Sequence, residues 1–297
     1  MKKHLSTIIL VIVLVVGLSL LLYPTVSDYW NSFHQSRAIA SYQNTVDSID
    51  ETSRQTILQE ADEYNKRLLT KADRWTMTDE DYAEYEGILN VSGTGIMGYV
   101  EIPSIQVQLP IYHGTDATVL QIAVGHIEGS SLPVGGIGTH AVISGHRGLS
   151  SARLFTDIDQ LTEGDIFRIS VLGGTLTYQV DQIHIVLPNE LNDLEIDRNQ
   201  DYCTLVTCTP YGVNSHRLLV RGRRIENEEN ARIIVQDASM VPYTHEAVIL
   251  TAVILVLYII ARKLLGLIDW EYILEHAFGR EENESKADRK KSKRKKT

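Results

Sequence analysis

The residues best suited to chemistry are the chain's two cysteines, Cys203 and Cys208, in the segment DYCTLVTCTP. This segment predicts a strand, in which residues five apart lie on opposite faces and about 16 Å apart. A disulfide needs Cα atoms within about 7 Å, so we expect two free thiols. Cys203 lies mid-strand and suits a small buried apolar side chain. Cys208 ends the strand before a turn, where a reactive group becomes accessible, and is therefore the predicted nucleophile.

A thiol nucleophile needs a base or a cationic neighbour to form its thiolate. Among the ten histidines, His146 follows Gly145 at the end of an apolar strand and is followed by Arg147 and Gly148. The flanking glycines permit close approach of another chain segment. His146 is therefore the predicted acid/base partner, with His140 on the same strand and His126 as alternatives.

Acyl chemistry also needs a group that holds a developing oxyanion. Arg217 follows Cys208 after the loop TPYGVNS and begins the strand RLLVRGRRI. A hairpin of that size can bring Arg217 beside Cys208, although composition alone leaves open a solvated row of arginines along this strand. The sequence has no C-x-x-C, H-E-x-x-H or acidic calcium loop, so neither a metal nor another cofactor is predicted.

The elements that position these residues are short strands separated by Gly, Pro, Asn and Asp. This pattern predicts a mostly-β domain at 91–227, a closed sheet or a sandwich, with short helices near 117–124 and 151–158. The polar segment 24–90 is predicted to form one or two helices. The expected strands are Met97–Ile102, Val107–Tyr112, His140–Ser144, Ile166–Val171, Leu176–Leu187, Tyr202–Cys208 and Arg217–Ile225.

Two apolar runs flank this body. Residues 5–23 are long enough, at ~1.5 Å per residue, to cross a hydrocarbon core of ~30 Å, and are predicted as a transmembrane anchor rather than a cleaved signal peptide. Residues 247–268 predict a second span, with a buried helix of the globular domain as the alternative. The basic N-terminus at 1–4 and the basic tail at 269–297 predict two cytoplasmic ends, the tail beside anionic lipid, and a catalytic domain outside the cytoplasm.

The charge distribution bears on the partners. The formal net charge is −10, and the body between the basic ends is more acidic still. Phosphate binding needs clustered Lys and Arg, so nucleic acid is not expected as a partner. An acidic body fits a protein that acts on other proteins.

Several segments, in order along the chain, resemble the sortases, and the class C pilus-assembling group especially. TLVTC (Thr204–Cys208) looks like the family's nucleophile motif, and SGHRG (Ser144–Gly148) like its histidine segment. A C-terminal span after the catalytic domain is also usual for class C. The other similar segments are MGYVEIPSI, LPIYHGT, GHIEGSSLPVGG and TPYGVNSHRLLVRG.

The resemblance implies an eight-stranded β-barrel with Cys208, His146 and Arg217 at one end. Cys208 would attack the Thr–Gly carbonyl of an LPXTG-type sorting signal, His146 would transfer protons, and Arg217 would stabilise the oxyanion or position the substrate. A lysine amine of a pilin subunit would then resolve the acyl-enzyme. The alternatives are a sortase that anchors surface proteins to a peptidoglycan amine, a non-catalytic membrane scaffold, and a hydrolytic cysteine protease.

Class C sortases commonly carry a lid before the barrel with an Asp-Pro-aromatic motif over the cysteine. The nearest match here is Asp73-Arg74-Trp75, which lacks the proline whose fixed φ would stiffen it. We therefore predict a possible lid formed by Asp73 and Trp75. The alternative is that Trp75 only packs against the barrel.

Overall fold

The computed structural model describes residues 2–227 and the single residues Thr251 and Tyr258. The predicted span at 247–268 lies, apart from those two residues, outside the described part, as does the tail at 269–297. Within the described part, one helix is long and apolar enough to cross a membrane; it is found at Ile12–Ser48, near the N-terminus. A signal sequence passes the same test, so the anchor at residues 5–23 stays a prediction.

Three helices precede the barrel: α1 (Lys2–Ser48), α2 (Glu51–Leu68) and α3 (Asp79–Gly87). The start of α2 is capped by Asp50, whose carboxylate accepts from the Ser53 N–H at 3.0 Å. The start of α3 has a capping box between Thr78 and Asp81. The helical character predicted for 24–90 is confirmed, but the segment holds parts of three helices rather than one or two, and α1 continues into it from Lys2.

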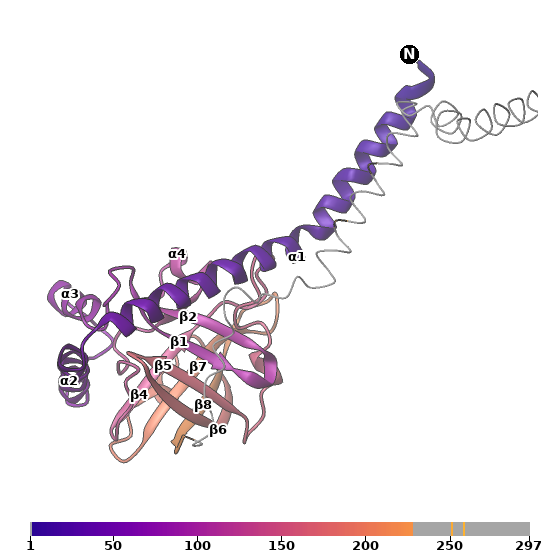
Figure 1. Cartoon of the computed structure of the whole chain (residues 1–297). Helices are drawn as coiled ribbons and strands as arrows, with labels where there is room; N and C mark the ends of the chain where they lie inside the picture. The colour runs from indigo at the N-terminus through magenta and orange to yellow at the C-terminus, as the bar shows by residue number, and fades with distance from the viewer. Residues whose placement is uncertain (1, 228–250, 252–257, 259–297) are drawn as a thin grey trace, which may run out of the picture. The chain divides into compact units, whose positions relative to one another are not determined.

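Eight strands close into a barrel in the order β1-β2-β3-β4-β7-β8-β6-β5 (Figure 1). Two of the neighbouring pairs, β2 with β3 and β4 with β7, are parallel, and the others are antiparallel. The strands are β1 (Ile96–Ile102), β2 (Val107–His113), β3 (Val124–His126), β4 (Thr139–Ser144), β5 (Ile166–Val171), β6 (Gly174–Val186), β7 (Asp201–Thr209) and β8 (His216–Ile225).

Seven of these strands match predicted ones, and the closed eight-stranded barrel is confirmed. The short strand β3 was not predicted, because three residues are too few to show an alternating pattern. The helix predicted near 117–124 is only one turn long, α4 (Ala117–Leu120). The helix predicted near 151–158 is wrong: this segment is turns followed by the 3₁₀ turn η2 (Ile158–Gln160).

Specific polar contacts fasten the preceding helices to the barrel. The Tyr42 hydroxyl of α1 donates to the Met97 carbonyl at 2.9 Å and accepts from the Leu172 N–H at 3.0 Å. The buried amide of Asn65 in α2 likewise makes two bonds with the Leu132 backbone, at 2.7 and 3.1 Å. Satisfied buried polar groups of this kind fix one docking geometry rather than a sliding apolar contact.

Candidate active site

Cys208 and Arg217 lie on the adjacent strands β7 and β8, and His146 lies two residues beyond the end of β4, the other neighbour of β7. In the β7–β8 pair, Cys208 is directly opposite Arg217. Of the two arrangements that the sequence left open, the structure therefore has the hairpin that returns Arg217 beside Cys208.

The register between β4 and β7 places His146 on the other side of Cys208. The two parallel strands advance together from Thr139 opposite Asp201 to Ser144 opposite Val206. Gly145 continues this ladder: its N–H donates to the Val206 carbonyl at 3.0 Å, and its carbonyl accepts from Thr207 Oγ1 at 2.8 Å. His146 and Cys208 are each the second residue beyond the last paired positions, Ser144 and Val206.

Strand alternation puts the side chains of Cys208 and Arg217 on the outer face of the barrel. Cys203 and Leu205 belong to the buried core, whereas Val206 belongs to a smaller apolar cluster on the other face. Cys208 lies on the Val206 face, as does Arg217 through its pairing, and Cys208 is partly exposed. A nucleophile on this face is open to an extended substrate without entering the core.

The two cysteines differ as predicted. Both are free thiols, and Cys203 is fully buried while Cys208 is not. Burial raises the pKa of the Cys203 thiol well above its usual value, which keeps that thiol neutral and unreactive.

The alternative histidines, His126 and His140, are structural. Each is buried with ring nitrogens engaged: His126 Nε2 lies 2.8 Å from the Ser131 carbonyl, and His140 Nε2 lies 2.7 Å from Thr204 Oγ1. Burial lowers the pKa of each from 6.5 to about 4, so both are neutral at physiological pH.

His146 is only partly buried, as a group that exchanges protons with a substrate must be. Its carbonyl accepts from the Phe155 N–H at 3.1 Å, which fixes the backbone that carries the ring. Partial burial lowers the pKa of His146 below 6.5, because desolvation disfavours the imidazolium. The ring is therefore mainly neutral at pH 7 and can accept a proton.

Arg217 differs from two other arginines of β8, Arg221 and Arg224. Arg221 makes a two-bond ion pair with Asp181, at 3.0 and 3.1 Å, and Arg224 lies 3.8 Å from Asp201. Arg217 Nη1 instead donates to the carbonyls of Asn214 and His216, at 3.3 and 3.1 Å. In residues 2–227 the structure gives it no carboxylate partner, so its positive charge remains available to an oxyanion.

The segment that carries the predicted lid packs on the same outer face. Trp75 contacts the cluster of Val142, Leu194, Val206 and Leu219. Val206 and Leu219 pair with each other two residues before the Cys208–Arg217 pair, and so lie next to it on the same face of the sheet. Asp73, by contrast, is exposed.

Arg74 was not singled out from the sequence, yet it fastens this segment. Its side chain is 6% exposed, and the guanidinium donates to the carbonyls of Gly129 and Leu194, each at 2.8 Å. It also lies 3.4 Å from Glu195 and 4.1 Å from the centre of the Trp75 ring. No sequence signal identifies it, because its partners are backbone carbonyls far along the chain.

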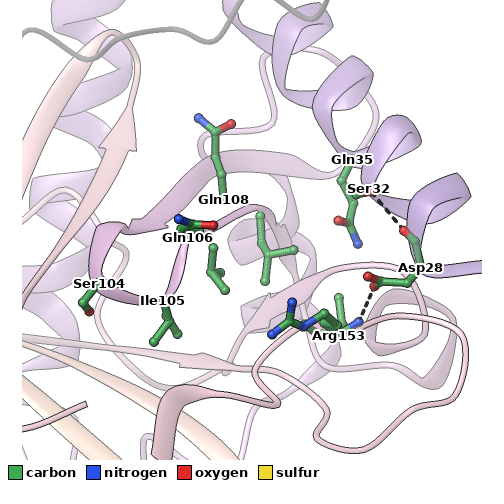
Figure 2. Close-up of a pocket in the computed structure, with 11 residues that line it drawn as sticks. Asp28, Ser32, Gln35, Ser104, Ile105, Gln106, Gln108 and Arg153 are labelled. Carbon is green, nitrogen blue, oxygen red and sulfur yellow. Dashed lines mark hydrogen bonds between the residues drawn. The ribbon is translucent and has the colours of Figure 1, made fainter. Parts of the chain in front are cut away.

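A polar pocket of about 340 Å³ lies between α1 and the turn from β1 to β2 (Figure 2). Its floor includes Gln35, Gln106 and Gln108, and the Asp28 carboxylate accepts from the Arg153 N–H at 2.7 Å. None of the three candidate catalytic residues lines it, so this pocket is not the candidate active site.

A metal site is not evident in the described residues, which contain no group of three or more His, Cys, Asp or Glu able to hold an ion. Cys208, His146 and Arg217 bring a thiol, an imidazole and a guanidinium to the candidate site. This combination suits nucleophilic acyl transfer.

Comparison with known proteins agrees with this chemistry. A family model described as a sortase domain matches residues 100–225. Sortase D of Bacillus subtilis is 31% identical over 131 residues, which cover 43% of this chain and 63% of that protein.

Solved structures extend the similarity to a larger share of this chain. The crystal structure of sortase C1 from Streptococcus agalactiae is 53% identical with a TM-score of 0.63, and the match covers 65% of this chain and 100% of that chain. The structure of Streptococcus pneumoniae sortase C is 44% identical with a TM-score of 0.59, covering 64% of this chain and 97% of that one. The chain belongs to the sortases, the family of cysteine transpeptidases.

Proposed function

We propose that this protein is a membrane-anchored sortase that joins pilin subunits, with Cys208 as nucleophile, His146 as acid/base and Arg217 as the oxyanion or substrate-positioning group. The pairing of Cys208 with Arg217 in β7 and β8, with His146 just beyond the neighbouring strand β4, carries the proposal. The similarity to sortase C structures, one of them described in terms of pilin substrate specificity, supports a pilin substrate.

The first half-reaction forms an acyl-enzyme. His146 takes the proton of the Cys208 thiol, and the resulting thiolate attacks the threonine carbonyl of an LPXTG-type sorting signal while the guanidinium of Arg217 faces the oxyanion that develops. The Thr–Gly C–N bond then breaks, and protonated His146 gives its proton to the departing amine. The product is a thioester on Cys208.

The second half-reaction transfers the acyl group. A lysine amine of the next pilin subunit attacks the thioester, neutral His146 takes a proton from it, and Cys208 leaves as the thiolate. The net result is an isopeptide bond, with no cofactor consumed.

The deciding experiment uses the full-length protein in lipid nanodiscs with an LPXTG peptide and two competing acceptors. One acceptor is a pilin peptide with a single lysine, and the other is an oligoglycine amine that stands in for peptidoglycan. Mass spectrometry identifies the products, with Cys208→Ala as the inactive variant and Cys203→Ala as the matched control.

Each outcome selects one function. Transfer to lysine that is lost only in Cys208→Ala supports the pilin polymerase. Transfer mainly to oligoglycine supports wall anchoring, and hydrolysis without transfer supports a protease. Absence of any reaction, even with the lid variant Trp75→Ala, supports a scaffold.

The membrane topology is part of the same proposal. The candidate span in α1 and the basic charge at both ends support an extracytoplasmic barrel with two cytoplasmic termini. Protease added to intact cells should remove epitopes inserted after Asn227 but spare a tag at the C-terminus. Loss of the C-terminal tag would exclude the second span.

A further inference from the structure

Beyond Gly145, β4 and β7 stop pairing, and the candidate site lies where they separate. The last bonds between them are those of Gly145 with Val206 and Thr207. His146 follows Gly145 outside β4, whereas Cys208 is still part of β7 and pairs there with Arg217 of β8. Something other than the ladder must therefore set the distance between their side chains.

The two segments meet again at Tyr211, which follows Cys208 after Thr209 and Pro210. The guanidinium carbon of Arg147 lies 5.8 Å from the centre of the Tyr211 ring. Gly148 has φ +74°, and a methyl group added there would lie 3.0 Å from Tyr211 Cε2. Glycine is needed at 148 both for this backbone conformation and for the close approach of the ring.

Arg147 and Gly148, which follow His146, are held in place by several contacts. The Arg147 side chain is 11% exposed and forms an ion pair with Asp159 of η2. The Gly148 N–H donates to Thr156 Oγ1 at 3.2 Å, next to the bond from the Phe155 N–H to the His146 carbonyl. The loop that carries His146 is thus bound to the segment 155–159.

Tyr211, which follows Cys208, is more exposed. Tyr211 is 61% exposed, and its ring rests on Arg147 and Gly148. A cation–π contact at an exposed position contributes only about 0.5–1 kcal/mol. Such a contact holds one arrangement in the free enzyme and still yields when a substrate enters.

We infer that Arg147 and Tyr211 form a clamp that sets the spacing of His146 and Cys208. The hydrogen bonds between β4 and β7 fix the backbone before His146 and Cys208, and the clamp fixes the backbone after them. The two residues act by positioning and touch no reacting atom. This inference rests on the proposed roles of Cys208 and His146, since spacing matters only if a proton passes between them and a substrate.

The test measures steady-state kinetics of peptide transfer with full-length protein in nanodiscs. Tyr211→Ala and Arg147→Ala should each lower kcat by ~10- to 100-fold, the effect of a misplacement of about 1 Å, while KM for the sorting peptide changes less than ~3-fold. Tyr211→Phe keeps the ring and should restore kcat. Val213→Ala, which truncates another exposed side chain of the same loop, is the matched control.

Two further readouts separate positioning from general damage. The double variant should be no slower than the slower single variant, because both changes remove one contact. In Tyr211→Ala, the pKa of His146, followed by NMR, should rise toward 6.5 as the loosened loop admits water. The buried Cys203 thiol should stay protected from reagents, which confirms an intact barrel.

Contrary results are equally distinct. If Tyr211→Ala matches Val213→Ala in kcat, or if the reductions multiply in the double variant, the clamp is wrong while the proposed function stands. If the wild type transfers nothing, the proposed function fails. The His146 titration then still decides whether Tyr211 controls the loop.

Discussion

Arg74 gives the sharpest test of whether the segment bearing Trp75 covers the nucleophile. We predict that Arg74→Ala releases this segment from the outer face and speeds modification of Cys208 by a thiol reagent. The physical reason is that Arg74 supplies the hydrogen bonds that fasten the segment, whereas Trp75 supplies the apolar contact.

The size of the effect follows from the hydrogen bonds that the substitution removes. Hydrogen bonds from a charged donor contribute about 1.5–3 kcal/mol each, and Arg74 makes two to carbonyls at 2.8 Å. The desolvation of the guanidinium, which also lowers the pKa of Arg74, offsets part of this sum. A net destabilisation of about 2–3 kcal/mol corresponds to a ~30- to 150-fold larger open population. Cys208 is partly exposed when the segment is closed, so we expect at least a ~10-fold faster labelling rate.

The assay is the pseudo-first-order rate of Cys208 alkylation, read by mass spectrometry, in full-length protein. Cys203 serves as an internal control, because its fully buried thiol reacts only when the barrel unfolds. Trp75→Ala should act in the same direction as Arg74→Ala. Arg198→Ala and Trp30→Ala, which truncate exposed residues of the same types, should leave the rate unchanged.

The reasoning is refuted if Arg74→Ala and Trp75→Ala both leave the Cys208 rate at the wild-type value. In that case Trp75 only packs against the barrel. A parallel rise in Cys203 labelling would instead mean that the variants destabilise the whole fold, and the local account would again fail.

Three other predictions rest on individual side chains. The free energy of unfolding should fall as pH drops from 6.5 toward 4, because burial lowers the pKa of His126 and His140 to about 4 and the unfolded chain then binds more protons than the folded one. Urea unfolding midpoints measured across this pH range check this prediction, and a midpoint that does not change with pH would contradict it. Arg217→Gln should lower kcat by ~100-fold and Arg217→Lys should lower it by less, since lysine keeps the positive charge but lacks the planar set of donors. If the Arg217→Gln variant is as active as the wild type, Arg217 has no role in the mechanism. Asn65→Ala should destabilise the fold by about 2–3 kcal/mol in urea unfolding, because it leaves the Leu132 backbone groups buried without partners.

The strands and the paired positions of Cys208 and Arg217 were predictable because they depend on local signals. Alternating apolar residues and turn residues mark the strands, and a short loop between two strands forces antiparallel pairing. The neighbourhood of His146 was harder, because β4 and β7 are parallel and far apart in sequence. No local pattern sets the register of such a pair; the flanking glycines favoured His146 but left His140 and His126 as alternatives, and the family resemblance supported His146.

The clamp and the Arg74 anchor could not be predicted, and for a shared reason. Each depends on an arginine whose partners are distant in sequence and are brought to it by the closed barrel. Arg74 bonds backbone carbonyls, and Arg147 contacts the Asp159 carboxylate and the Tyr211 ring. In a sequence, Arg74 and Arg147 look like ordinary surface cations, yet their side chains are 6% and 11% exposed. Burying a guanidinium is unfavourable unless its donors are satisfied, so the barrel must hold these partners in place before the arginine can dock. It follows that the clamp and the Arg74 contacts should break before the barrel unfolds, since each depends on the geometry of the barrel and contributes little to holding the barrel together. Native-state hydrogen exchange of the loops at 73–76 and 146–148 should accordingly be faster than that of β4 and β7, and equal rates would mean that these loops are part of the cooperative core.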